Sequence, residues 1–302
     1  ITVRRGVQQF AIHNHTGYMA SYTRSPLSIE VIIRRVEGDD VLILYDMSGV
    51  TVWQKDYMAF VRGLGERLRL ARNLTTIEAG RMPVVLSPSG AIALVLPVMQ
   101  GVNGKNVFKG VSPMAGKLGE RLFHKGISFS DDATIDGGFR SAPFDEEGVP
   151  HRRSTLVEKG ELKGFVYDLL TAAQSGVEST GNGARDLFNP PQPAPTHIVL
   201  EPGETDVVDM LCEVDHGLLV EDVLGLGQGN ILSGAFSNPL SLAFKIEKGE
   251  IVGRVKDVSI AGNVYEVLKD VGAVSRESRW VYNRARLPYL LIPNMKVVAR
   301  QR

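Results

Sequence analysis

The residues that could do chemistry gather in two short segments, and the first of these is an acidic turn. It spans residues 145–148, which are Asp145, Glu146, Glu147 and Gly148. Successive carboxylates before a glycine offer the oxygen ligands that a hard cation prefers. The same run is typical of a solvated surface turn, so both interpretations remain open from the residues alone.

The second segment, here called the Asn182 loop, spans residues 180–185. Its members are Thr180, Gly181, Asn182, Gly183, Ala184 and Arg185. Glycine lets a backbone approach a ligand closely, and an asparagine side chain offers both a donor and an acceptor for peptide amides. We therefore expect the acidic turn and the Asn182 loop to contact a peptide. A loop that merely needs glycines at positive φ explains the pattern as well.

Histidine and cysteine give no strong metal motif. The 6 histidines show neither H-x-x-x-H nor H-x-x-E-H spacing. His13 and His15 would share a face if the turn at residues 13–17 were extended, but no third ligand is evident. Cys212 is the only cysteine, which rules out an intrachain disulfide and a CxxC site. We expect its thiol to be buried among apolar side chains.

Composition narrows the function classes. The 302 residues are 43% hydrophobic and 23% charged, which is typical of a globular protein that buries a sizeable core. The 34 basic and 34 acidic residues cancel. This balance argues against direct nucleic-acid binding and against a polybasic membrane surface. The apolar run at residues 91–99 is shorter than the roughly 18 residues that span a bilayer. The chain begins at Ile1 in the middle of a strand pattern, so we expect that an amino-terminal portion is missing.

Periodicity predicts strands at both ends of the chain and two helices between them. Residues 1–53 have the pattern of strands, and apolar residues at helical spacing predict a helix over 57–71. A short strand over 82–86 precedes an apolar helix at 91–99, in which Pro97 is expected to cause a break or a kink. From residue 127 onward short strands dominate, with two further short helices near 204–214 and 263–270.

Two segments, residues 157–162 and 246–251, have nearly identical sequences. Each places Lys-Gly between two stretches in which apolar and polar residues alternate, which predicts a tight hairpin. The fold class is therefore α+β and mostly antiparallel. We expect a strand-rich carboxy-terminal domain over 81–302, either barrel-like or a large curved sheet. It would be preceded by residues 1–80, the end of an α+β amino-terminal domain.

The two candidate segments also carry a family resemblance. Residues 141–150, followed by 156–168, are similar to the D-D/E-E-G and E-x-G-x-L core of TldD/PmbA proteins, and residues 178–183 resemble the T-G-N-G/A loop of that family. Further matches run in order from about 81 to 298, including residues 106–123, 217–220 and 244–263. The resemblance is thus continuous and specific over the second part of the chain.

The resemblance implies a proteolytic context. Proteins of this family were long named for modulation of DNA gyrase, and they form a peptide-trimming system of a TldD subunit and a TldE/PmbA subunit. TldD-type chains hold zinc with an H-E-x-x-x-H helix and a later cysteine. The corresponding positions here are Val95, Leu96 and Gln100, Pro97 would distort the helix, and residues 275–290 contain no cysteine.

Valine and leucine offer zinc no lone pair. The resemblance therefore implies the TldE/PmbA branch, with no catalytic residue, metal or other cofactor of its own. Implied partners are a zinc-bearing TldD-type subunit or a second copy of this chain, acting as a dimer on peptides or unfolded polypeptides in the cytoplasm.

Two alternatives remain. One is a divergent homodimeric metallopeptidase that uses His13, His15 or residues 145–147 as ligands. The other is a peptide-binding or regulatory protein without a proteolytic role. Metal content separates the first alternative from a noncatalytic subunit. A TldD-type gene beside that of this chain would argue against the second.

Overall fold

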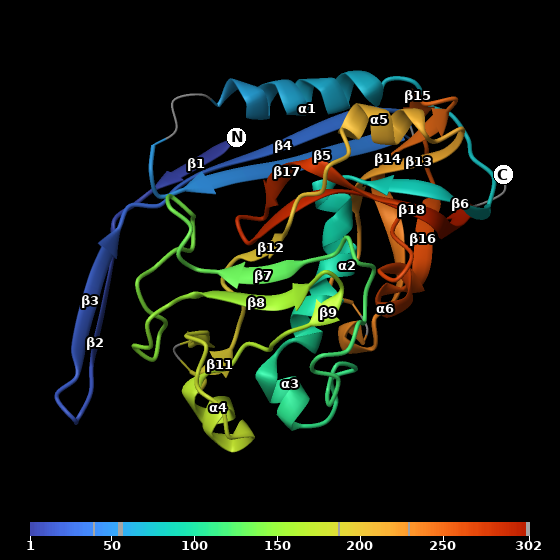
Figure 1. The fold of residues 1–302 in the computed structure, drawn as a ribbon. Helices are drawn as coiled ribbons and strands as arrows, with labels where there is room; N and C mark the ends of the chain where they lie inside the picture. The colour runs from blue at the N-terminus through green and yellow to red at the C-terminus, as the bar shows by residue number, and fades with distance from the viewer. Residues whose placement is uncertain (39, 54–56, 187, 229, 300–302) are drawn as a thin grey trace.

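The computed structural model describes residues 1–38, 40–53, 57–186, 188–228 and 230–299. Strands dominate, and short helices lie between them (Figure 1). The elements are β1 (Thr2–Arg5), β2 (Gln8–His13), β3 (Met19–Arg24), β4 (Leu27–Glu37), β5 (Asp40–Val50), α1 (Met58–Leu70), β6 (Gly80–Leu86), α2 (Pro88–Gly101), α3 (Gly104–Phe108), β7 (Phe129–Asp132), β8 (Arg153–Glu158), β9 (Glu161–Leu162), α4 (Leu169–Ser175), β10 (Gly183–Ala184), β11 (Gln192–Pro193), β12 (Ile198–Leu200), α5 (Val207–Cys212), β13 (His216–Val223), the 3₁₀ helix η1 (Ile231–Ser233), β14 (Ala235–Glu247), β15 (Glu250–Arg254), β16 (Val258–Asn263), α6 (Val264–Val267), β17 (Ala273–Val281) and β18 (Ala285–Ala299).

The centre of the molecule is a large sheet that closes on itself. Strands β14, β13, β6 and β18 pair in that order, and β16 pairs with both β18 and β14. These five strands therefore form a closed barrel, which removes free edges. Most of its pairings are antiparallel, and only β13 with β6 is parallel in the ring. The sheet continues from β18 through β12 and β7 to β8 and β9. The expected α+β, strand-rich and barrel-like fold is confirmed.

Helix α2 packs against this sheet. The side chain of Ser87 caps its first turn by accepting a hydrogen bond from the backbone N–H of Gly90 at 3.3 Å, and Pro88 follows the cap. Nearly every side chain of the helix is apolar and buried, and it lies against β13, β17 and β18. The helix runs through Pro97 to Gly101, so the proline does not break it.

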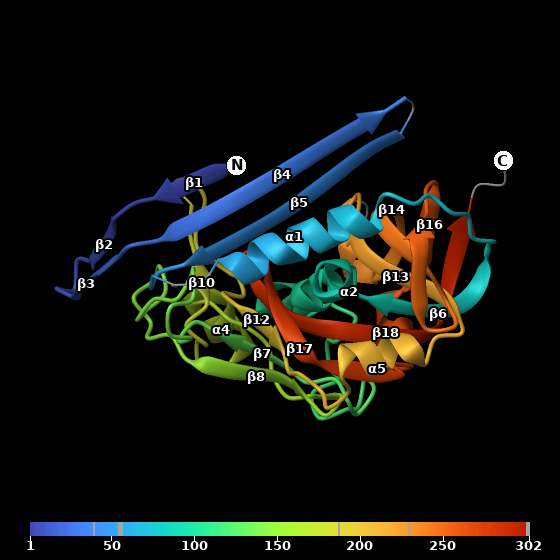
Figure 2. The same ribbon diagram turned by 90° about the horizontal axis from the view of Figure 1, so that it is seen from above.

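The β4–β5 ribbon and α1 cover the other face of the sheet. The long β4–β5 ribbon and α1 lie beside each other over the barrel (Figure 2). Leu42 and Leu44 of β5 enter one apolar cluster with Phe244 and Leu219 of the barrel. The domain boundary near residue 80 stays a proposal. In the structure, the residues on its two sides share an extensive apolar contact.

Ion pairs join the same two layers. At one end of the ribbon, Asp40 accepts hydrogen bonds from the guanidinium of Arg254, and the Nζ of Lys256 lies 3.0 Å from an Asp40 oxygen. Farther along β5, Asp46 pairs with Arg67 of α1 within the covering layer, and Nη1 of Arg279 on β17 lies 3.8 Å from Oδ2 of Asp46 across the two layers. Arg254 is only 2% exposed, so its charge depends on Asp40 for compensation.

A separate two-stranded hairpin, β2–β3, extends away from the body of the molecule (Figure 1). Its base is anchored by aromatic side chains, because the ring of Tyr22 stacks on Phe10 at 5.5 Å and meets Phe144 edge-on at 5.2 Å. A turn predicted at residues 13–17 lies between the two strands at residues 14–18, and His13 is the last residue of β2.

Several local predictions can be compared with the structure. Lys159-Gly160 and Lys248-Gly249 are hairpin turns in which all four residues have positive φ. The two predicted short helices exist but are shorter, as α5 and α6. The prediction for Cys212 is wrong: this residue ends α5 at the surface and is exposed.

Candidate functional site

The acidic turn is a self-contained hairpin-like loop. Both Oδ1 contacts of Asp145 are backbone N–H groups, those of Glu147 and Val149 at 2.9 Å each. Gly148 has φ +85°, a conformation that favours glycine, and its carbonyl accepts a hydrogen bond from the hydroxyl of Tyr18 at 2.7 Å. Asp145 is therefore committed to shaping the turn, and the β2–β3 hairpin rests on it.

The structure brings the acidic turn and the Asn182 loop together. The N–H of Gly183 donates to Oδ2 of Asp145 at 2.7 Å, and the N–H of Glu146 donates to the carbonyl of Gly183 at 3.0 Å. The backbone N–H of Arg185 donates to the carboxylate of Glu146. The two segments that were singled out separately in the sequence thus form one unit, here called the double loop.

Asn182 lies inside the double loop. It is 3% exposed, and its Oδ1 accepts a hydrogen bond from the hydroxyl of Thr180 at 2.6 Å. Its Nδ2 donates to Oδ2 of Asp131 at 2.5 Å and to the carbonyl of Ala194 at 3.2 Å. Both amide hydrogens and the carbonyl oxygen of Asn182 therefore have partners within the chain. A peptide would meet the backbone of this loop rather than the Asn182 amide.

Asp131 on β7 is the residue that sequence reasoning missed. Its Oδ1 accepts from the N–H groups of Thr196 at 2.7 Å and His197 at 2.9 Å, while Oδ2 accepts from Asn182. Burial raises the pKa of Asp131 to about 7, although the three N–H donors pull the pKa in the opposite direction. The Ser-Asp-Asp run at 130–132 gave no signal, because its partners lie far away in sequence.

His197, next to these contacts, is completely buried. Its ring nitrogens lie 3.1 Å from the carbonyl oxygen of Asp132 and 3.1 Å from the N–H of Arg140. This pairing requires that Nδ1 donates and Nε2 accepts, which is the neutral form. Burial lowers the pKa of His197 to about 4. We assign this histidine a role in holding the 131–142 segment in place.

The outer parts of the double loop have other environments. Oε2 of Glu147 accepts from the N–H of Leu169 at 2.8 Å. Burial raises the pKa of Glu147, and the neighbouring carboxylates of Asp168 and Asp145 act in the same direction against the Leu169 hydrogen bond. Arg185 is exposed at the rim. Contact of the double loop with a peptide stays a proposal.

The positions that correspond to zinc ligands lie on α2. Val95 is 1% exposed and packs in the core, Leu96 is partly buried, and Gln100 is exposed. The stretch in which a cysteine ligand would be expected, residues 275–290, belongs to the β17–β18 hairpin, against which α2 packs. These residues do not fit zinc, because the valine and leucine at two of the motif positions have no lone pair to donate.

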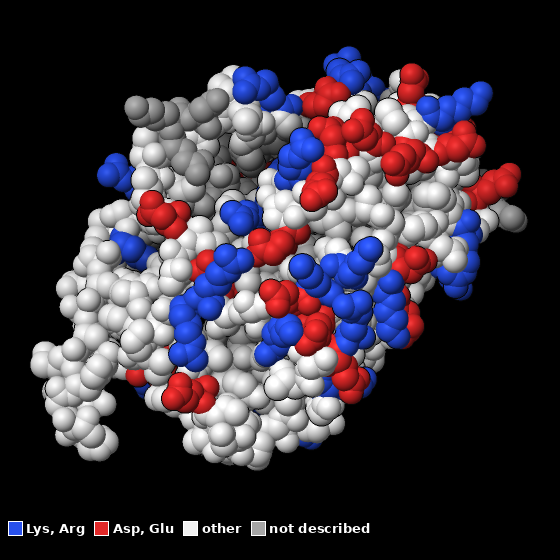
Figure 3. Space-filling view, viewed as in Figure 1, with Lys and Arg blue, Asp and Glu red and all other residues white. Residues whose placement is uncertain are grey.

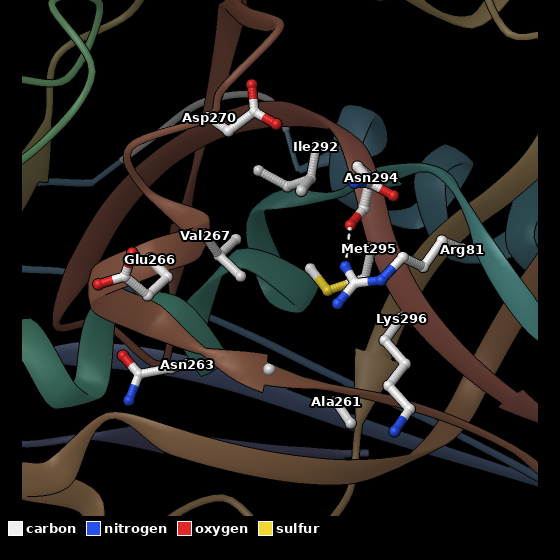
Figure 4. A pocket seen from close by; sticks show the side chains of 11 residues that line it. Arg81, Ala261, Asn263, Glu266, Val267, Asp270, Ile292, Asn294, Met295 and Lys296 are labelled. Carbon is white, nitrogen blue, oxygen red and sulfur yellow. Dashed lines mark hydrogen bonds between the residues drawn. The ribbon is translucent and has the colours of Figure 1, made fainter.

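A hollow of about 120 Å³ lies beside this helix. Leu96 and Pro97 form one wall, and residues 225–228 and 235–239 contribute to the other. A second hollow, of about 220 Å³, lies between β16, α6 and β18 (Figure 4). Its lining includes the basic residues Arg81 and Lys296 and the acidic residues Glu266 and Asp270. None of the candidate site residues named from the sequence lines it.

Metal-ligating side chains are scattered in the part of the chain that the structure describes. There, no group of three or more His, Cys, Asp or Glu side chains is placed to hold a metal ion. His13 and His15 are exposed at the tip of the β2–β3 hairpin, far along the chain from the acidic turn. Charged side chains of both signs are interspersed on the face drawn in Figure 3. No helix among the described residues has the length and apolar character needed to cross a membrane.

Comparison with known proteins decides the family. Residues 79–299 match the model of the PmbA/TldA metallopeptidase C-terminal domain, so the match covers most of the chain. The chain belongs to the TldD/PmbA family. The similar solved structures include TldE from Thermococcus kodakarensis, with a TM-score of 0.89 and 29% identity over 97% of this chain and 67% of that one.

Other TldD/PmbA proteins agree with this assignment. A protein called a modulator of DNA gyrase from Thermotoga maritima superimposes with a TM-score of 0.83 at 28% identity, over 97% of this chain and 67% of that one. A metalloprotease TldD homolog from Haemophilus influenzae is 33% identical over 68% of this chain and 43% of its own length. The chain thus spans about half the length of the curated TldD/PmbA relatives that it matches.

Proposed function

We propose that this chain is a noncatalytic, TldE/PmbA-like subunit that pairs with a zinc-bearing TldD-type metalloprotease subunit and helps to wall a peptide-binding cleft. The observation that supports the proposal most strongly is the filling of the zinc-ligand positions on α2. Val95 packs in the core and Leu96 borders a hollow. Both side chains are hydrocarbon, so neither can donate a lone pair to a metal. Zinc would then belong to the partner, and this chain would contribute substrate contacts.

The double loop supplies surface for such contacts. The bonds from Asp131 and Asp145 to the Asn182 loop hold its backbone in one arrangement. A preorganised backbone can pair with the main chain of an extended peptide without losing much entropy. The substrates would then be peptides or unfolded polypeptides, which can adopt an extended conformation at low cost.

The competing function is that of a homodimeric metallopeptidase. It requires at least three ligands at one point, and the acidic turn offers few free oxygens, because three backbone N–H groups occupy both carboxylate oxygens of Asp145. His13 and His15 could still recruit a metal with ligands from a second copy. The non-proteolytic alternative shares the peptide contacts but needs no zinc-bearing partner.

Co-expression with a TldD-type subunit from the same genome tests the proposed function. We expect the two chains to co-purify, and the pair to cleave unfolded polypeptide while this chain alone does not. Cleavage by this chain alone would favour the homodimeric metallopeptidase. Failure of the two chains to associate, together with retained peptide binding, would favour the regulatory alternative.

A further inference from the structure

Both tryptophans of the chain lie at one place. Trp53, which follows β5, and Trp280, near the end of β17, line the same hollow of about 230 Å³. Trp53 is 70% exposed, so a large indole is held in water beside the cavity. Tryptophan is strongly favoured at sites where a partner buries it. The hollow is smaller than the roughly 300–1,000 Å³ of sites for drug-sized ligands, which suits a single side chain.

Two glycines that line the hollow, Gly49 and Gly138, have no room for a side chain. A Cβ on Gly49 would stand 2.3 Å from Nδ2 of Asn283, and a Cβ on Gly138 would stand 2.8 Å from Cε1 of His197. The N–H of Thr51 donates to the carbonyl of Gly137 at 2.9 Å, which ties the end of β5 to the opposite wall. The cavity is therefore bounded by backbone that is fixed in place.

Trp280 is also held in a defined position. Its ring meets the buried ring of His197 edge-on, with the centroids 4.9 Å apart and the planes at 62°. His197 in turn is fixed by its hydrogen bonds to backbone groups on both sides. The indole that lines the hollow is thus preorganised, which lowers the entropic cost of binding.

The charge of the lining favours a cation. Asp136 is exposed, and it is the only charged residue among the described residues that line the hollow. Indole rings attract cations through the negative potential of their faces, and tryptophan does so best among the aromatic residues. A carboxylate beside two indoles therefore suits a ligand with a positive head and an apolar stem.

We propose that this two-tryptophan hollow binds the basic side chain, arginine or lysine, of a peptide substrate. The inference rests on the proposed peptide-binding function and adds a side-chain preference to it. The hollow adjoins the 131–142 segment, which leads directly into the acidic turn. A peptide that crosses the double loop could then place one basic side chain between Trp53 and Trp280.

Tryptophan emission tests the proposal directly, because the hollow contains all the tryptophan of the chain. The intact chain is titrated with blocked tetrapeptides that carry one arginine, one glutamate or only alanine, and calorimetry measures the same binding independently. We expect a saturable emission change with the arginine peptide and none with the other two. Spermidine is titrated as well, because a polyamine also combines positive charge with an apolar stem. Tighter binding of spermidine than of the arginine peptide would contradict a peptide ligand.

Substitutions locate the binding. Asp136→Asn should raise the Kd of the arginine peptide by about two- to fivefold. Asp215→Asn, which changes an exposed carboxylate between α5 and β13, should leave the Kd unchanged. Trp53→Phe replaces the exposed indole with a phenyl ring, which is a weaker partner for a cation, and keeps Trp280 as the sole tryptophan reporter. It should weaken binding by a similar factor. Thermal unfolding of each variant shows whether it folds as the parent chain does.

Besides tighter binding of spermidine, two results would overturn the proposal. One is no calorimetric binding of the arginine peptide, and the other is a Kd that neither Asp136→Asn nor Trp53→Phe alters. The outcome is separable from that of the proposed function. If the pair with a TldD-type subunit cleaves peptides while the hollow binds none, only the side-chain preference fails. If the hollow binds the arginine peptide and the pair cleaves nothing, the proteolytic role fails instead.

Discussion

The side-chain amide of Asn182 donates to the buried carboxylate of Asp131, with Nδ2 and Oδ2 2.5 Å apart. This contact fastens the Asn182 loop to β7 of the central sheet, across 51 positions of sequence. Asp145 fastens the same loop to the acidic turn through the N–H of Gly183. The double loop is therefore a rigid extension of the sheet, and its polar side chains mainly hold its own backbone.

The first prediction concerns this anchor. Asn182→Ala should lower the free energy of unfolding by about 1–3 kcal/mol, because Asp131 would lose a donor while it stays buried. Asn294→Ala, at an exposed position, is the matched control and should change it by less than about 0.5 kcal/mol. Urea unfolding measures both. Equal stability of the two variants would show that the Asn182 contact contributes nothing.

The second prediction separates backbone strain from steric contact. Gly181 and Gly176 have similar positive φ values of +73° and +66°, but a Cβ on Gly181 would lie 2.5 Å from the carbonyl oxygen of Pro150, whereas Gly176 faces open space. Both alanine variants should lose about 1–2 kcal/mol through the left-handed conformation. Gly181→Ala should lose about 1–3 kcal/mol more. Thermal unfolding compares the two variants. Similar losses of stability would mean that the backbone near Pro150 shifts to make room for the added Cβ.

The third prediction uses pH. Burial acts to raise the pKa of Asp40, but hydrogen bonds and charge from Arg254 and Lys256 outweigh it, and the pKa is lowered. The carboxylate therefore stabilises the fold fully above its unfolded pKa of about 3.9, and this stabilisation is lost as pH falls through the lower folded value. Asp40→Asn should cost about 3 kcal/mol at pH 7.

As the pH falls below the unfolded pKa of about 3.9, the difference in the free energy of unfolding between Asp40→Asn and the parent chain should shrink. Unfolding in denaturant at several pH values checks this. A difference that stays constant between pH 7 and pH 3 would mean that the effect of the substitution comes from packing and not from the charge of Asp40.

Local patterns were sufficient to predict much of the fold. The Lys-Gly turns at 159–160 and 248–249 followed from residues that tolerate positive φ. The apolar helix predicted over 91–99 lies within α2, which begins three residues earlier, at Pro88. A barrel-like fold was expected, but the strands that close it could not be predicted, because closure depends on β16 pairing with both β14 and β18. Asp131 was missed for the same reason: its role depends on partners that only the tertiary fold brings near.

The candidate site was predicted in part. Both halves of the double loop were candidate segments in the sequence. The sequence could not indicate that the side-chain amide of Asn182 would form all its hydrogen bonds within the chain. The prediction of a buried Cys212 failed because the general tendency of free cysteine gave way to a place at the exposed end of α5. The two tryptophans drew no attention, since 227 positions separate residues that the fold places around one hollow.

Zinc stoichiometry tests the central claim most directly. The chain is purified alone and together with a TldD-type subunit, stripped with a chelator, reloaded with zinc and dialysed before elemental analysis. The account predicts no tightly held zinc in this chain alone, since Val95 and Leu96 occupy the ligand positions, and stoichiometric zinc in the pair. Tightly held zinc at one ion per chain in this chain alone, with peptide cleavage, would contradict it.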